Sequence, residues 1–87
     1  MKIKIKNRSG LHARPAAIFV STCKKYRSTI KIQKHGKIAD AKNMLQILAL
    51  GIDYGDEITL IIDGDDENTA YRDLKDLLEK HLPAIDK

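Results

Sequence analysis

The sequence predicts an α+β fold, an open-faced β-sandwich of order β-α-β-β-α-β-α, in which three helices cover one face of a four-stranded antiparallel sheet. Two patterns predict this fold. Short segments alternate between apolar and polar residues, as strands with one buried face do, and the segments between them repeat apolar residues at helical spacing. The chain has 87 residues, 43% hydrophobic and 32% charged, so we expect residues 1–87 to form one small domain.

The first half of the chain predicts a strand, a helix and a pair of strands. Residues 2–6 alternate lysine with inward-facing isoleucine, and residues 29–33 alternate in the same way. Between them, residues 13–26 predict a helix. Its buried face consists of Ala16, Phe19, Val20 and Cys23. A glycine-containing turn then leads to a short returning strand at residues 37–39.

The second half predicts a short helix, a strand and a longer helix. Residues 42–49 form the short helix, which Gly51 ends as a C-terminal cap, and residues 57–63 alternate as the fourth strand. An aspartate then caps the last helix, which runs to about residue 82, where Pro83 stops it. The core face of this helix is made by Ala70, Leu74, Leu77 and Leu78.

Residues 10–16, with the sequence Gly-Leu-His-Ala-Arg-Pro-Ala, are the most informative segment for function. They place His12 at the start of the first helix and Pro15 in its first turn, where a missing N–H is tolerated. The free N–H groups and the positive end of the helix dipole attract an anion such as phosphate, and Arg14 adds a permanent charge. A histidine beside an anion site can carry a phosphoryl group, whereas an isolated histidine at a helix start is more often a solvated cap.

This segment resembles the active-site signature of HPr, the histidine-containing phosphocarrier of the bacterial phosphoenolpyruvate-dependent sugar phosphotransferase system. The resemblance extends over essentially the whole chain and implies the sheet order 1-4-2-3. The other segments that follow the order and spacing of the family are Gly36-Lys37, Lys42-Asn43-Met44-Leu45, Leu50-Gly51-Ile52, Gly55-Asp56-Glu57-Ile58-Thr59 and Asp66-Glu67-Asn68.

The resemblance also implies a role for each residue around the motif. His12 would accept a phosphoryl group on its pros nitrogen from Enzyme I and pass it to a sugar-specific Enzyme IIA domain. The chain would then be a carrier with a phosphohistidine intermediate rather than a free-standing enzyme. Arg14 and the backbone N–H groups near Ala13 would hold the phosphoryl oxygens. The other binding residues expected beside His12 are Ser9, Pro15 and Ala17, where Ser9 either shapes the loop or is a simple turn residue.

A second group of expected binding residues lies on the short helix predicted at residues 42–49. This helix has more apolar side chains than one buried face can hold, so some of them must be exposed. In the family, the corresponding positions bind both Enzyme I and the IIA partners. The resemblance therefore assigns Met44, Leu45 and Leu48 to a docking surface, and methionine suits a surface that must fit several partners.

Three positions depart from the family pattern. Many members from Gram-positive bacteria carry a serine, phosphorylated by an ATP-dependent kinase, where this chain has Asn43. Asparagine caps a helix as well as serine but has no hydroxyl, so we expect no phosphorylation there. Ala17 and Gln46 also differ from common family residues. These differences leave open a sugar system or a nitrogen-related or dihydroxyacetone phosphorelay.

The composition of the chain predicts where the protein is located and whether it holds a cofactor. No apolar run is long enough to span a bilayer and no signal-peptide pattern is present, so we expect a cytoplasmic protein that does not insert into membranes. Cys23 is the single cysteine and the three histidines are scattered, so we expect no disulfide, metal or other cofactor. The net charge of +4 suits an acidic or phosphorylated protein partner, and we expect a monomer.

Three other classes of function remain as alternatives. Nucleic-acid binding is disfavoured because the outward sheet positions carry lysines without the aromatic residues on which bases stack. A regulatory binding module without phosphotransfer is disfavoured because His12, Arg14 and Pro15 are all present. A hydrolase or metal enzyme is disfavoured because no second acid–base group or ligand set is evident near His12.

Overall fold

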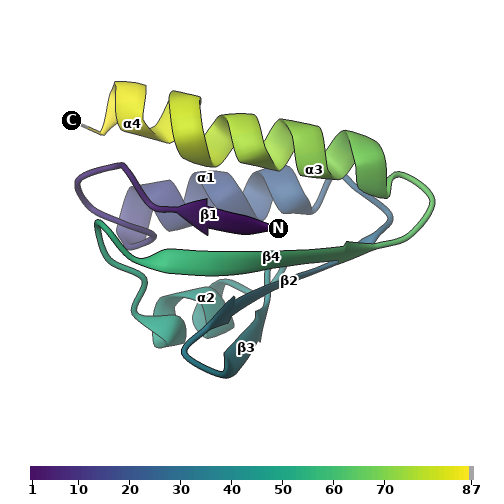
Figure 1. Cartoon of the computed structure of the whole chain (residues 1–87), viewed down its shortest axis with the longest axis horizontal. Coiled ribbons are helices and arrows are strands. Elements are labelled where there is room, and N and C mark those ends of the chain that lie inside the picture. Colours follow the sequence, from purple (N-terminus) through teal and green to yellow (C-terminus); the bar gives the residue numbers. More distant parts are fainter. Residues whose placement is uncertain (87) are drawn as a thin grey trace.

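The computed structural model describes residues 1–86 and confirms the predicted fold class and the sheet order (Figure 1). One antiparallel sheet has the strand order β1-β4-β2-β3. Its strands are β1 (Lys2–Lys4), β2 (Thr29–Lys34), β3 (Lys37–Asp40) and β4 (Glu57–Asp63). The bounds of β4 agree with the alternation in the sequence, and β2 and β3 each extend one residue further than predicted.

The helices lie together on one face of the sheet (Figure 1). They are α1 (Ala13–Cys23), α2 (Met44–Leu50), α3 (Glu67–Asp76), the π-helical segment η1 (Leu77–His81) and α4 (Leu82–Ile85). The last three follow one another without a break, so residues 1–86 form the three predicted helical rods. No helix within residues 1–86 combines the length and the apolar content needed to cross a membrane.

The core fills the layer between the sheet and the helices. Strand β4 alternates buried and more exposed residues, and its register pairs Ile58 with Ile3 and Leu60 with Ile32. Phe19 of α1 is fully buried among these side chains. Cys23 lies in the same core, and burial raises the pKa of its thiol to about 12, so this thiol is a packing group.

The structure corrects the ends of two predicted elements at the N-terminus. Strand β1 ends at Lys4 rather than at residue 6, because the N–H and C=O of Ile5 bond to the loop at residues 55–56 instead of the sheet. Helix α1 ends at Cys23 rather than at residue 26. After Cys23 the backbone closes into tighter turns, in which Tyr26 N–H donates to Cys23 O at 3.2 Å.

The short helix α2 also begins later than predicted, at Met44. Asn43 is its N-cap, and the Asn43 side chain accepts a hydrogen bond of 3.2 Å from Gln46 N–H. Gly51 ends the helix in the left-handed conformation, with φ 64° and ψ 49°, as predicted.

The prediction that Pro83 stops the last helix is wrong. Leu82 N–H donates to Leu77 O, five residues earlier, so the helix widens into a π-turn just before the proline. Pro83 then stands in the first turn of α4, where its missing N–H leaves no bond broken. The chain therefore remains helical to Ile85.

Asp66 occupies the predicted N-cap position of α3, but its side chain does not cap the helix. Its carboxylate instead accepts hydrogen bonds from Arg27 N–H at 2.9 Å, from Ser28 N–H at 3.0 Å and from the Ser28 hydroxyl. These bonds, led by that of the Ser28 hydroxyl, hold the pKa of Asp66 below its ordinary value. Asp66 therefore ties the start of α3 to the residues just before β2.

Candidate active site

His12 lies where the loop after β1 enters α1. It is the N-cap residue, with φ −110° and ψ 155°, and its side chain makes no capping bond, so the ring is available for other contacts. The loop before it packs tightly on the chain after α2, since Leu11 N–H donates to Ile52 O at 2.9 Å. Gly10, with φ +61°, permits this approach, because a Cβ there would lie 2.2 Å from Ile52 O.

The first turn of α1 supplies donors beside the ring. The N–H groups of Ala13 and Arg14 have no intrahelical acceptor by position, and Pro15 has no N–H. Ala13 has φ +41°, a conformation that costs a non-glycine residue on the order of 1–3 kcal/mol. The strain falls on the residue next to His12, as expected where a backbone is shaped for a ligand.

Arg14 is exposed at the same helix end, and no carboxylate of residues 1–86 pairs with its guanidinium. A pocket of about 350 Å³ opens beside it. The lining residues are Ser9, His12, Ala13, Arg14, Pro15, Ile18, Ile85 and Asp86. The structure therefore brings the predicted His12, Ala13, Arg14 and Pro15 together around one opening.

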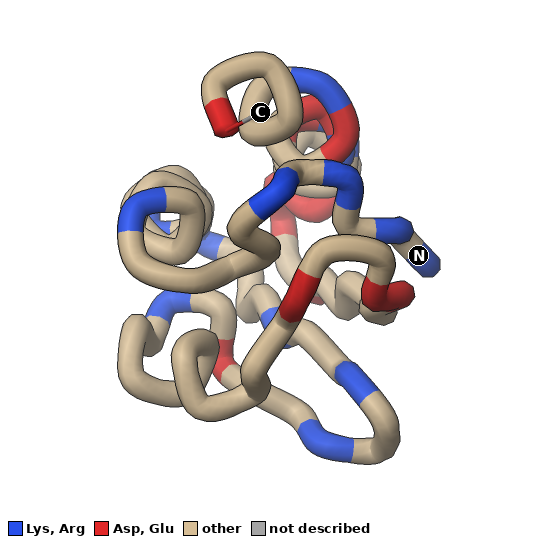
Figure 2. Tube along the Cα trace, turned by 90° about the vertical axis from the view of Figure 1, so that its left-hand side faces the viewer, with Lys and Arg blue, Asp and Glu red and all other residues tan. Residues whose placement is uncertain are grey.

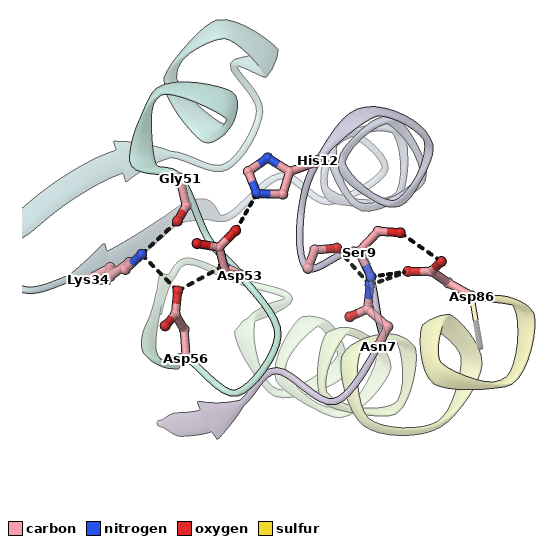
Figure 3. A network of polar contacts seen from close by, with 9 residues as sticks. Asn7, Ser9, His12, Lys34, Gly51, Asp53, Asp56 and Asp86 are labelled. Atoms are coloured by element: carbon pink, nitrogen blue, oxygen red, sulfur yellow. Dashed lines mark hydrogen bonds and ion pairs between the residues drawn. The ribbon is translucent and has the colours of Figure 1, made fainter.

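Ser9 also lines this opening, but Asp86 near the C-terminus binds both of its polar groups (Figure 3). Asp86 accepts hydrogen bonds from Ser9 N–H at 2.8 Å, from the Ser9 hydroxyl at 2.9 Å and from Asn7 Nδ2 at 3.0 Å. The bond from Asn7 is the leading cause that holds the pKa of Asp86 below its ordinary value. Ser9 therefore shapes the loop, the first of the two readings that the sequence left open.

The ring of His12 has an acidic partner that sequence reasoning missed. His12 Nε2 lies 2.7 Å from Asp53 Oδ1, and the two side chains are 44% and 69% exposed (Figure 3). The expectation that no acid–base group lies near His12 is therefore wrong. The only signal in the sequence was a carboxylate in the turn after Gly51, and it lies 41 positions further along the chain than His12.

A second polar cluster fixes the turn that carries Asp53. The side chain of Lys34 is mostly buried, and its Nζ contacts Asp56 Oδ2 at 2.7 Å and donates to Gly51 O at 2.6 Å. The same carboxylate of Asp56 accepts from Asp53 N–H at 2.8 Å. The hydrogen bond from Lys34 is the main reason that the pKa of Asp56 is lowered. Strand β2 thus holds the turn at both ends.

The segments that carry these polar contacts lie together at one end of the molecule (Figure 2). In that view the loop before α1, the turn after α2 and the C-terminal helix face the reader, and basic and acidic stretches alternate among them. Within residues 1–86, no group of three His, Cys, Asp or Glu side chains could hold a metal ion. The arrangement is a histidine with one free ring nitrogen, an arginine and open helix donors, which suits transfer of an anionic group.

A family model described as "PTS HPr component phosphorylation site" matches residues 1–80. The chain belongs to the HPr family.

Individual HPr-family proteins are similar over most of their length. The HPr-like protein Crh of Halalkalibacterium halodurans is 40% identical over 79 residues, which are 91% of this chain and 94% of the relative. The crystal structure of HPr-C-His from Thermoanaerobacter tengcongensis has 44% identity and a TM-score of 0.92, covering 94% of this chain and 92% of that one. A crystal structure described as an HPr dimer from the same organism has 45% identity and a TM-score of 0.78, with 92% of each chain covered.

In this HPr-family chain, the residues expected to dock partners lie on α2, which packs beside α1. Leu45 is 79% exposed and Leu48 is 37% exposed, whereas Met44 is half-buried against the core. Ile47 is fully buried and holds the helix to the core. We refer to Met44, Leu45 and Leu48 as the α2 surface. Of the other expected residues, Ala17 is exposed on α1 and Asn43 is exposed at the start of α2.

Proposed function

We propose that this chain is a phosphocarrier that accepts a phosphoryl group on His12 from phosphorylated Enzyme I and passes it to Enzyme IIA domains. The orientation of the His12 ring supports the proposal most directly. Nε2 is held by Asp53, whereas Nδ1 makes no hydrogen bond to any group of residues 1–86. Nδ1 can therefore act as the nucleophile. The free N–H groups of Ala13 and Arg14 follow directly along the chain.

The transfer conserves the phosphoryl group at each step. The Nδ1 lone pair attacks the phosphorus of phosphohistidine on Enzyme I, the new N–P bond forms, and the donor nitrogen keeps the electrons of the broken bond. The phosphoryl oxygens then accept hydrogen bonds from backbone N–H groups and from the Arg14 guanidinium. All of these donors are exposed, so the stabilisation stays moderate and the group can be passed on to Enzyme IIA.

The α2 surface is the proposed contact for both partners. Leu45 and Leu48 present exposed apolar area on the helix that precedes the Asp53 turn. Both partners would bind this area in turn, which requires it to be free of a second copy, so the chain would act as a monomer. It would act in the cytoplasm. A relative described as an HPr dimer shows that a chain of this fold can also self-associate. The proposal names a sugar system first, and a nitrogen-related or dihydroxyacetone phosphorelay remains the alternative pathway.

Incubation with phosphoenolpyruvate, magnesium and a bacterial Enzyme I tests the proposal. We expect one acid-labile, alkali-stable phosphoryl group per chain, detected by intact-protein mass spectrometry. The variants His35→Ala and His81→Ala remove exposed histidines outside the site and should be labelled as fully as the wild type. Failure of the folded wild-type chain with several Enzyme I proteins, including those of the alternative phosphorelays, would favour a regulatory binding module.

Asn43 leads to a prediction about regulation. We expect no phosphorylation by the ATP-dependent HPr kinase, because the N-cap of α2 has no hydroxyl. Asn43→Ser keeps a capping side chain and adds the missing acceptor, so it is the matched variant. Labelling with radioactive ATP measures both proteins, beside an HPr from a Gram-positive bacterium as a positive control. An acid-stable phosphoryl group on the wild-type chain would contradict the prediction.

A further inference from the structure

Asp53 contacts one of the two ring nitrogens of His12. Its Oδ1 lies 2.7 Å from His12 Nε2, and an ionised carboxylate can only accept hydrogen bonds. Nε2 must therefore be the donor in this contact. In a neutral imidazole the other nitrogen then carries the lone pair, so the contact leaves Nδ1 unprotonated.

The backbone at Asp53 is held on two sides, and Figure 3 shows the side formed by Asp56 and Lys34. Asp53 N–H donates to Asp56 Oδ2 at 2.8 Å, and its C=O accepts from Asp56 N–H at 3.1 Å. Lys34 holds the Asp56 carboxylate at 2.7 Å, and on the other side Leu11 N–H binds the C=O of Ile52. The turn is therefore tied to β2 and to the loop that carries His12. The backbone under Asp53 is therefore held in place, and from it the carboxylate reaches the His12 ring.

We propose that Asp53 is a positioning residue for His12, which holds the ring in the Nε2–H tautomer and balances its charge once Nδ1 is phosphorylated. The inference rests on the proposed phosphocarrier function and adds to it a residue outside the helix-start motif. Asp53 touches the ring on the nitrogen that does not react. It acts on the transfer through His12 rather than on the phosphoryl group itself.

The charge on the ring explains the second part of this role. When a ring with a proton on Nε2 forms a bond from Nδ1 to phosphorus, both nitrogens are substituted and the ring becomes positive. The proton stays on Nε2, and the Asp53 carboxylate then forms a charge-assisted hydrogen bond with it. Arg14 is placed to balance the phosphoryl oxygens. The Asp53 carboxylate thus balances the positive ring, and the Arg14 guanidinium balances the negative phosphoryl group.

Asp53→Asn is the variant that tests the inference. The amide keeps the shape of the carboxylate but can offer either its oxygen or its NH₂ group, so it no longer determines the tautomer. Asp65→Asn is the matched control, because Asp65 is an exposed carboxylate in the loop before α3 and the change of net charge is the same. Both substitutions lie on the surface, and circular dichroism verifies the fold.

Nitrogen-15 NMR of the unphosphorylated imidazole rings in mildly alkaline solution provides a readout that does not depend on activity. We expect His12 in the wild type and in Asp65→Asn to show the Nε2–H tautomer alone, and in Asp53→Asn to show a mixture. The maximal rate of transfer from Enzyme I should fall about tenfold in Asp53→Asn, the scale of one charge-assisted hydrogen bond. The half-saturating concentration should stay within about twofold, because Asp53 acts on the ring.

The two readouts separate this inference from the proposed function. Equal tautomer populations and equal rates in Asp53→Asn and Asp65→Asn would overturn the role of Asp53 while leaving the carrier function intact. A rise in the half-saturating concentration alone would also overturn it, since Asp53 would then be a docking residue. If the wild type accepts no phosphoryl group, the proposed function fails, and the NMR comparison still decides whether Asp53 sets the tautomer.

Discussion

A His12→Ala variant is expected to accept no phosphoryl group from phosphorylated Enzyme I, while its free energy of unfolding changes by less than about 1 kcal/mol. The loss is complete because the side chain removed is the acceptor itself. The stability cost is small because the His12 side chain is 44% exposed and, among residues 1–86, it bonds only to Asp53, itself an exposed residue. Mass spectrometry after incubation with phosphoenolpyruvate and Enzyme I measures the first quantity, and urea unfolding measures the second.

The controls for this variant are the other two histidines. His35 lies in the turn between β2 and β3 and His81 lies near the C-terminus, and both are exposed. If His12→Ala were still labelled and His35→Ala were not, the phosphoryl group would be on His35 rather than on His12, and the proposed site would be abandoned.

A Gly10→Ala variant is expected to lose about 3 kcal/mol of unfolding free energy and roughly 15 °C in melting temperature. The added Cβ would lie 2.2 Å from Ile52 O and 2.7 Å from Asp53 Cα, both backbone atoms that cannot move aside alone. The residue would also keep a φ of +61°, which is strained for alanine. Because the two loops would separate, the contact between His12 and Asp53 should weaken as well.

Gly36→Ala separates the two causes of this loss. Gly36 has φ +78°, but a Cβ there meets nothing within 4 Å, so we expect only the conformational cost of about 1 kcal/mol. Thermal unfolding followed by circular dichroism compares the two variants. Equal melting temperatures would show that the loops accommodate the methyl group and that their close packing is not needed.

The sequence pattern predicts the sheet better than the ends of the helices. Alternation depends on each residue and its neighbours, so the four strands could be found, and β4 was predicted to the residue. The order of the strands came from the family resemblance. The effect of Pro83 was predicted wrongly because the helix accommodates this proline only through the π-turn before it, and no local sequence pattern predicts that turn. An aspartate, Asp66, does stand at the predicted N-cap, but its side chain makes no capping bond because it bonds to residues 38 and 39 positions away in the chain.

In the candidate site, too, only the residues that are close in sequence could be predicted together. His12, Arg14 and Pro15 lie at the start of one helix, and their spacing was sufficient to predict that helix start. Asp53 and Asp86 reach the site from segments 41 and 77 residues distant from their partners. Neither carries a motif of its own, so only the folded structure shows that Asp53 contacts the ring and that Asp86 contacts the loop before it.

Onward transfer tests the central claim most directly, because a carrier must give up what it accepts. The phosphorylated chain would be isolated from Enzyme I, mixed with Enzyme IIA domains, and followed by the loss of its label. The proposal predicts that the phosphoryl group leaves His12 and appears on at least one IIA domain. Label that stays on the chain, while a reference HPr charges the same IIA domains under the same conditions, would contradict it.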